Sequence, residues 1–267
     1  MKRKVNIHGR GCVPEEQMIQ NLASCKARGL PYVSVKPRPA LAVVGGGHSA
    51  RWHVEEIRAW SGDVWACGSV YHWLKSLGIE STLFCVDPQP LLASMAVGAK
   101  KALLASSCDP SAFDELKDAD VEVFDLIKDG VGVPHGPTTG TTAFALSFAH
   151  MGYTDVSFFG FDSSYSEEAV SDKPEKYRLT VQTHAYKTEP EFLMMRVVCN
   201  GRAFITCAEF LVQAQWMADM FRTEIGKRGF IKNRSGGLLA ALIEDPDYDC
   251  THLSPMFKQN LVFEEAA

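Results

Sequence analysis

The chain has 267 residues, a formal net charge of −5, and 46% hydrophobic and 22% charged residues, which is the composition of an ordinary globular protein. The charge argues against a nucleic-acid partner, because nucleic-acid-binding proteins need a basic surface. No apolar stretch reaches the roughly 18 residues that suggest a membrane span, and the basic N-terminus lacks the apolar segment of a secretory signal. We therefore expect a cytoplasmic protein without a membrane partner.

The predicted elements alternate between strands and helices along the first part of the chain. Apolar runs typical of buried strands lie at 40–44, 64–67, 82–86, 101–105, 121–124 and 156–159. Each run is followed by a stretch that can form a helix. This alternation predicts an α/β protein with a Rossmann-like open, mostly parallel sheet and helices on both faces.

The remaining elements are mainly helical. Helices are expected at 15–28, 51–60, 141–151 and 207–227, and a short strand at 230–231. Polar residues at 163–176 predict a surface loop, and an apolar segment follows Gly236 and Gly237. We interpret 1–38 as an N-terminal helical extension, 39–245 as one nucleotide-binding transferase domain and 246–267 as a C-terminal tail.

The eight cysteines show no C-x-x-C pair and no zinc-ligand spacing. Several of them, such as Cys67 and Cys85, lie inside apolar runs. Buried thiols in a reducing compartment are therefore expected rather than disulfides or a metal site.

Three consecutive glycines follow the first predicted strand: Gly45, Gly46 and Gly47, continued by His48 and Ser49. A glycine loop between a strand and a helix lets backbone amides approach an anion, so it predicts a phosphate site. The alternative is a turn that binds nothing. A dinucleotide site is disfavoured because the second strand is followed by Ser69 and not by the Asp or Glu that binds the ribose in such sites. A P-loop is disfavoured because no lysine followed by Ser or Thr ends the glycine loop.

A second cluster opens the predicted buried helix and is rich in hydroxyl groups. It consists of Thr138, Thr139, Gly140, Thr141 and Thr142. Such a helix start predicts a second phosphate or ribose site. The alternative for any one of these hydroxyls is capping of the helix.

Three titratable residues complete the candidate site. Asp87 and Asp162 follow strands, so their carboxylates are candidates for Mg²⁺ bound with a nucleotide. Each carboxylate has the alternative of capping a turn. His184 is a candidate general acid or base, with a surface histidine as the alternative.

Four segments together resemble the 6-hydroxymethylpterin diphosphokinase (MptE-like) family, in the shorter stand-alone form often carried by phages and prophages. They read VVGGGHSA, FCVDPQP, HGPTTGTTAFALSFAHMGYTDVSFFGFDSSY and THAY. The likeness runs from about residue 21 to about residue 242. The segment 139–165 is also similar to a bacterial sialyltransferase family with a related fold.

The resemblance implies a nucleotide-using transferase. Members of the first family move a diphosphate from ATP to a pterin alcohol with Mg²⁺, whereas the sialyltransferases use a CMP-sugar and a histidine base. Carried onto this chain, the glycine loop, Ser69 and the threonine cluster hold the nucleotide. Asp87 and Asp162 serve the metal or the acceptor, and His184, Ser163 and Tyr186 lie on the acceptor side.

Two positions depart from the family pattern. The family loop usually continues Gly-Pro-Ser-Leu, whereas this chain has His48 and Ala50 in place of the proline and the leucine. An asparagine common after the second strand is replaced by Ser69. Diphosphate transfer from ATP to a small alcohol is the main hypothesis. A glycosyltransferase using a nucleotide-activated sugar, and a non-catalytic nucleotide-binding module, are the alternatives; acceptor and oligomeric state stay open.

Overall fold

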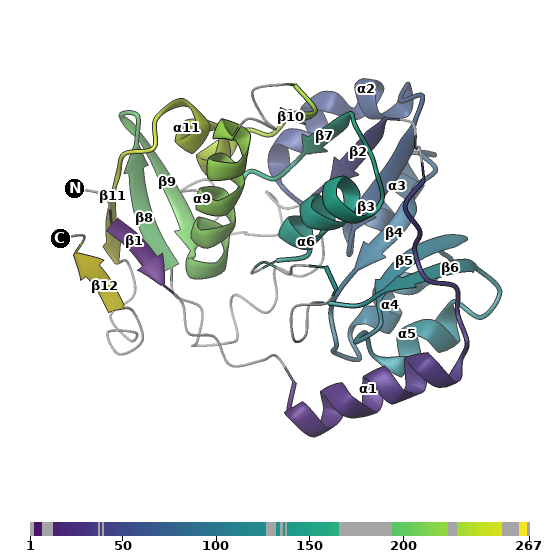
Figure 1. Ribbon diagram of the computed structural model, residues 1–267. Coiled ribbons are helices and arrows are strands. Elements are labelled where there is room, and N and C mark those ends of the chain that lie inside the picture. The colour runs from purple at the N-terminus through teal and green to yellow at the C-terminus, as the bar shows by residue number, and fades with distance from the viewer. Residues whose placement is uncertain are drawn as a thin grey trace. The chain divides into compact units, whose positions relative to one another are not determined.

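The computed structural model describes residues 3–6, 13–36, 38, 40–126, 132–133, 136, 138–165, 194–223, 229–252 and 262–265. The central sheet is mostly parallel and has seven strands (Figure 1). Their order is β10 (Ile231–Asn233), β7 (Val156–Phe159), β2 (Leu41–Val44), β3 (Asp63–Cys67), β4 (Thr82–Cys85), β5 (Lys101–Ala105) and β6 (Asp120–Phe124). The predicted Rossmann-like α/β fold is therefore confirmed, with the six strands expected for its sheet, and the short strand predicted at 230–231 joins the same sheet as β10.

The chain divides into two compact units, each made of separate segments. Unit 1 comprises Met1–Gly9, Gly46–Val54 and Ser157–Ala267. Unit 2 comprises Arg10–Gly45 and Glu55–Val156. The glycine loop from Gly46 onward thus belongs to unit 1. The predicted single domain over 39–245 stays a prediction.

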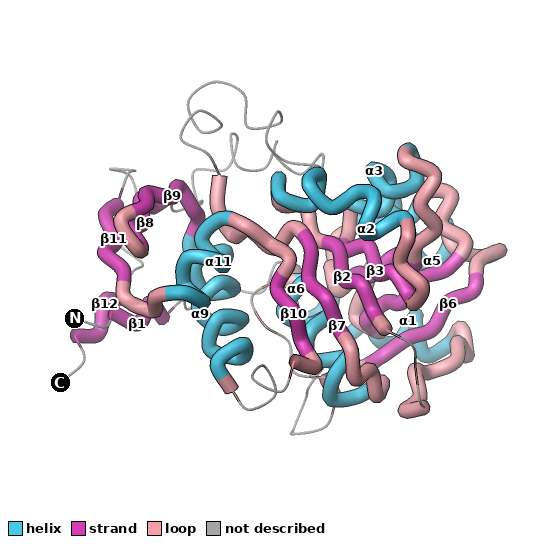
Figure 2. Tube along the Cα trace, turned by 90° about the horizontal axis from the view of Figure 1, so that it is seen from above, coloured by secondary structure: helices cyan, strands magenta, loops and turns pink. Residues whose placement is uncertain are grey.

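Unit 2 contains the strands β2 to β6, which follow one another in space as they do in sequence. Helices α3 (Val70–Ser76) and α6 (Thr139–Ala145) both pack on β3 and lie on opposite faces of the sheet (Figure 2). Burial on both faces explains why β2 reads as an unbroken apolar run. The other helices of this unit are α1 (Glu15–Ala27), α2 (Val54–Arg58), whose first residue belongs to unit 1, α4 (Leu92–Ala96) and α5 (Pro110–Glu115).

The buried helix predicted at 141–151 begins two residues earlier than expected. Helix α6 starts at Thr139 and continues into a π-helical turn, η2 (Leu146–His150). Gly152 then takes a φ of 80°, which is the left-handed conformation that favours glycine after a helix. The predicted helix end is confirmed at this glycine.

The N-terminal helix α1 covers loops at the carboxyl ends of two strands in unit 2. The buried amide of Asn21 donates hydrogen bonds to the carbonyl oxygens of Pro88, at 3.1 Å, and Ser107, at 3.0 Å. These residues lie in the loops that follow β4 and β5. The helix therefore occupies an edge of the sheet where open α/β proteins often bind ligands.

Unit 1 carries a small antiparallel sheet that the sequence analysis did not predict. Its strands are ordered β11 (Tyr248–His252), β8 (Met194–Cys199) and β9 (Arg202–Cys207), beside helix α9 (Ala208–Arg222) (Figure 1). Asn200 and Gly201, both at positive φ, form the two-residue turn between β8 and β9. A further pair of strands is formed by β1 (Arg3–Asn6) and β12 (Val262–Glu265).

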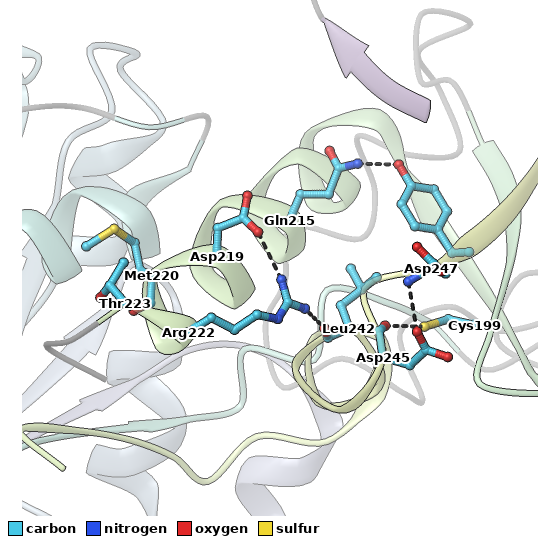
Figure 3. A network of polar contacts seen from close by, with 10 residues as sticks. Cys199, Gln215, Asp219, Met220, Arg222, Thr223, Leu242, Asp245 and Asp247 are labelled. Atoms are coloured by element: carbon cyan, nitrogen blue, oxygen red, sulfur yellow. Dashed lines mark hydrogen bonds and ion pairs between the residues drawn. The ribbon is translucent and has the colours of Figure 1, made fainter. Parts of the chain in front are cut away.

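Helix α11 (Gly237–Glu244) packs against α9 and corresponds to the last apolar segment of the sequence. Polar contacts hold the two helices and their neighbouring strands together (Figure 3). Arg222 donates to the carbonyl oxygen of Leu242 and pairs with Asp219 at 2.9 Å. The thiol of Cys199 donates to the carbonyl oxygen of Asp245.

Three further expectations can be compared with the described residues. The helix predicted at 51–60 is a 3₁₀ helix, η1 (His48–His53), continued by α2 as far as Arg58. No disulfide links the seven cysteines in the described ranges. Within those ranges, too, no helix has both the length and the apolar character needed to cross a bilayer.

Candidate functional site

The strand order reverses between β2 and β7. The chain places β2 to β6 in sequence and then returns to add β7 on the other side of β2. In open α/β sheets, ligands bind outside the carboxyl ends of strands where the order reverses in this way. The topology therefore selects the loops that follow β2 and β7, at Gly46–Val54 and from Gly160 onward, both of which belong to unit 1.

These two loops are in direct contact at Gly47. Its N–H donates to the carbonyl oxygen of Gly160 at 2.7 Å. A Cβ atom on residue 47 would lie 2.6 Å from that oxygen and 2.7 Å from Cγ of Asp162. Glycine is thus required at position 47 by the close approach of the protein's own backbone.

The carboxylate of Asp162 lies at the centre of the cluster and is 6% exposed. It accepts hydrogen bonds from the N–H of Ser49 at 2.8 Å, from the hydroxyl of Ser49, and from the N–H of Gly236 at 3.2 Å. The N–H of Gly236 also lies 3.0 Å from the Ser49 hydroxyl oxygen. We call Ser49, Asp162 and Gly236 the Asp162 cluster.

The Asp162 cluster joins the starts of two helices. Ser49 lies in the first turn of η1, and Gly236 is the N-cap of α11. Helix starts present N–H groups that attract an anion. Here the anion is a side chain of the protein, so the N–H groups of Ser49 and Gly236 are satisfied internally.

Three N–H groups of the predicted phosphate site already have hydrogen-bond partners within the protein. The N–H of Gly47 is bonded to Gly160, that of Ser49 to Asp162, and that of Ala50 to the carbonyl oxygen of Gly47 at 3.2 Å. The predicted role in phosphate binding thus rests on Gly45, Gly46 and His48. For these three residues it stays a prediction.

Ser163, predicted on the acceptor side, is 5% exposed and bonded within unit 1. Its hydroxyl accepts from the side chain of Gln213 at 2.8 Å, and its carbonyl oxygen accepts from the hydroxyl of Thr206 at 2.7 Å. Its φ of 54° is rare for a residue other than glycine. The two contacts hold this strained residue in place beside Asp162.

The threonine cluster in unit 2 caps helix α6. The hydroxyl of Thr138 accepts from the N–H of Thr141 at 3.4 Å, and the N–H of Thr138 donates to the hydroxyl of Thr141 at 3.2 Å. The hydroxyl of Thr142 lies 3.5 Å from the carbonyl oxygen of Thr138. The capping alternative is therefore confirmed for Thr138 and Thr141, and a ligand role for Thr139, Gly140 and Thr142 stays a prediction.

Asp87 and Ser69 also belong to unit 2. The carboxylate of Asp87 accepts from the N–H of Gln89 at 3.0 Å, which is the turn-capping alternative. Burial raises the pKa of the Asp87 carboxyl above its ordinary value. Ser69 is 6% exposed and is the N-cap of α3, but its side chain makes no capping hydrogen bond.

The role in Mg²⁺ binding predicted for Asp87 and Asp162 stays a prediction, since the two carboxylates belong to different units. Asp87 lies in unit 2 and Asp162 in unit 1. Among the described residues, no group of three or more His, Cys, Asp and Glu side chains is placed to bind a metal ion. Since its oxygens accept three hydrogen bonds, Asp162 fits a structural acceptor better than a metal ligand.

His184 and Tyr186, predicted for the acceptor side, lie outside the described residues. Conversely, the structure brings in two residues that the sequence analysis did not select as site residues: Gly236 and Trp52. The sequence signal that could have pointed to Gly236 is the pair of glycines before an apolar run. The signal for Trp52 is its position within five residues of the glycine loop, and the structure places its ring against Gly236.

Comparison with known proteins shows a likeness of fold. No protein-family profile matches the chain, and no curated protein does. Among solved structures, the chain is similar to the MAf glycosyltransferase from Magnetospirillum magneticum AMB-1, with a TM-score of 0.55 and 19% sequence identity. The likeness covers 83% of this chain and 36% of the glycosyltransferase chain.

Proposed function

We propose that the chain is a nucleotide-dependent transferase that moves a glycosyl group from a nucleotide-activated sugar to a small-molecule or sugar acceptor. The observation that carries the proposal is the convergence of the glycine loop and the loop after β7, where the strand order reverses. The likeness over 83% of the chain to a glycosyltransferase favours glycosyl transfer over other uses of a nucleotide.

The proposed reaction needs few groups from the protein. The acceptor's hydroxyl oxygen forms a bond to the anomeric carbon of the donor sugar, while the bond from that carbon to the phosphate oxygen breaks. The nucleoside phosphate leaves with the electron pair, and a general base takes the hydroxyl proton. Within this proposal Asp162 is a positioning residue, because its oxygens already accept hydrogen bonds from Ser49 and Gly236. His184 is the predicted base.

Diphosphate transfer from ATP with Mg²⁺ is the second candidate. The resemblance of residues 43–50, 84–90 and 135–165 to the MptE-like family favours it. The two candidates differ in the ligand that each requires. Glycosyl transfer predicts binding of a sugar nucleotide and its nucleoside phosphate, whereas diphosphate transfer predicts binding of ATP that depends on Mg²⁺.

A thermal-shift panel distinguishes the candidates. The full chain is heated with ATP, GTP, UDP, CMP and their sugar nucleotides, each with and without Mg²⁺. A ligand at 100 times its dissociation constant stabilises the folded state by about 2.7 kcal/mol, which gives a measurable rise in Tm. Stabilisation by a nucleoside phosphate and its sugar nucleotide supports glycosyl transfer. Stabilisation by ATP alone, and only with Mg²⁺, contradicts it and supports the second candidate.

Inorganic phosphate at matched ionic strength is the control for nonspecific anion effects. A hit is followed by incubation with the sugar nucleotide and a panel of acceptors, with release of the nucleoside phosphate as the readout. Binding without turnover for every acceptor favours the non-catalytic module. If no nucleotide raises Tm at millimolar concentration, the common premise of a nucleotide site is wrong.

A further inference from the structure

Trp52 exposes 68% of its surface although tryptophan gains more from burial than most residues. It lies in η1, which follows the glycine loop directly. Single exposed apolar residues are common on protein surfaces and need no explanation by themselves. The position of Trp52 in unit 1, beside the glycine loop, separates it from exposed apolar side chains of unit 2, such as Val35 and Leu91.

The indole ring is held in place on two sides. A Cβ atom at residue 236 would lie 3.1 Å from Cζ3 and 3.4 Å from Cη2 of Trp52, so one edge of the ring lies against the backbone of Gly236. The imidazole of His48 meets the indole edge to face, with ring centroids 6.0 Å apart and an angle of 88° between the planes. A side chain at position 236 would require the ring to shift by a few tenths of an ångström.

These contacts tie the ring to the Asp162 cluster. Gly236 donates its N–H to Ser49 and Asp162, so the surface on which Trp52 lies is itself fixed by buried hydrogen bonds. A ring that is fixed in advance loses little conformational entropy when a ligand stacks on it. The remaining exposed surface of the indole is therefore suited to a flat ligand.

The charge next to this ring suits a ligand that is also anionic. Arg51 is exposed, and among the described residues it has no ion-pair partner. A guanidinium binds phosphate with paired N–H groups. An exposed indole that follows a glycine loop, with an arginine as its neighbour in sequence, matches the aromatic base and the phosphate of a nucleotide better than it matches a neutral sugar.

We propose that Trp52 is the stacking platform for the base of the nucleotide ligand. This inference rests on the proposed nucleotide-dependent function and assigns the base-binding residue for it. Removing an aromatic ring that stacks on a base costs about 1–3 kcal/mol, which corresponds to a loss of affinity of about 5- to 150-fold. Trp52→Ala is therefore expected to weaken nucleotide binding by this factor, and Trp52→Phe by only a few-fold.

The affinity test uses calorimetric titration of the full chain with the nucleoside phosphate that gives the largest thermal shift. Wild type, Trp52→Ala, Trp52→Phe and the exposed control Leu91→Ala are compared, and the control is expected to bind as wild type does. Equal affinity in wild type and Trp52→Ala overturns the inference and leaves the proposed function standing. Absence of binding by wild type overturns the proposed function and the inference with it.

A second measurement separates stacking from an indirect effect on folding. Acrylamide quenches an exposed tryptophan, and a base stacked on Trp52 is expected to protect it. The protected part of the emission should be present in wild type and missing from Trp52→Phe, although both bind the ligand. Equal protection in the two proteins, or no quenching of Trp52 before ligand is added, overturns the inference.

Discussion

Ser49 and Asp162 form a two-point hydrogen-bonded pair between residues 113 positions apart in the sequence. The N–H of Ser49 donates to one carboxylate oxygen at 2.8 Å, and its hydroxyl donates to the other. Both residues are buried. This pair fixes the start of η1 on the loop after β7, and it gives the glycine loop its conformation without any ligand.

Ser49→Ala should destabilise the protein by about 1–3 kcal/mol, because it leaves a buried carboxylate oxygen and the N–H of Gly236 each without one partner. The free energy of unfolding in urea measures this change. Ser76→Ala is the matched control, since that hydroxyl is exposed and bonds only to the carbonyl oxygen of Trp73. A loss no larger than that of the control would show that the pair contributes nothing.

Asp162→Asn should destabilise the protein by about 1–3 kcal/mol. Both carboxylate oxygens of Asp162 accept hydrogen bonds from N–H groups, and the substitution replaces one of these oxygens with an NH₂ group, which can only donate. The double variant with Ser49→Ala should lose less than the sum of the two single losses, with a coupling energy of about 0.5–3 kcal/mol. Urea unfolding of the four proteins measures the cycle. Additive losses would contradict a shared hydrogen-bond network.

Gly47→Ala should destabilise the protein more than Gly78→Ala does. The added Cβ at 47 would lie 2.6 Å from the oxygen of Gly160, and forcing such an atom into a packed site costs about 1–3 kcal/mol. Gly78 is the control because a Cβ there meets nothing within 4 Å and only its positive φ is strained. That strain costs about 1–2 kcal/mol. The comparison is made by thermal unfolding, and the reverse order would refute the close approach at Gly47.

Asp87→Asn should stabilise the protein at neutral pH. Burial raises the pKa of the folded-state carboxyl, so ionised Asp87 destabilises the fold at a pH above both its folded and its unfolded values. The cost disappears well below the ordinary aspartate pKa of about 3.9, where the carboxyl is protonated in both states. It grows as pH rises from the unfolded to the folded pKa and is complete above the folded pKa.

The gain of Asp87→Asn over wild type should therefore be present at about pH 7 and vanish below about pH 3 in urea unfolding. The amide introduced by this substitution retains an oxygen that can accept from the N–H of Gln89, so the turn is preserved. Exposed Asp118→Asn is the control and should show no such pH-dependent gain. A gain that is independent of pH would mean that desolvation of the carboxylate is not its cause.

Arg222→Lys should cost about 1 kcal/mol, whereas Asp219→Asn should cost almost nothing. The guanidinium of Arg222 binds both the carboxylate of Asp219 and the carbonyl oxygen of Leu242 (Figure 3). Leu242 is buried, whereas the side chain of Asp219 is 75% exposed. A lysine cannot reach both partners with a planar fork. The free energy of unfolding of both variants, measured in denaturant, checks the order of the losses. Equal losses would mean that the exposed ion pair, and not the bond to Leu242, stabilises the protein.

The parallel sheet could be predicted from sequence because each of its strands is a short apolar run closed by turn residues. The hairpin of β8 and β9 was missed, although Asn200 and Gly201 between two runs of six residues give a strong hairpin signal. The capping of α6 was predicted as an alternative because threonine is a common N-cap residue, and the structure shows a capping box between Thr138 and Thr141.

The Asp162 cluster could not be predicted from local patterns. Asp162 meets Ser49 and Gly236 only because the chain returns to the far side of β2 and later adds β10. A local pattern shows that Gly47 lacks a side chain but not which atoms approach it. The contacts of Asp162 with Ser49 and Gly236 therefore come from the structure alone.

The long separations within the Asp162 cluster set an order for folding during synthesis. Ser49 leaves the ribosome before either partner, since Asp162 follows it by 113 residues and Gly236 by 187. Domains fold as their residues emerge, and contacts between distant residues form late. Strands β2 to β6 can therefore pair on a nascent chain whose glycine loop still has no partner. The ribosome has to deliver nearly the whole chain before that loop can take its final form.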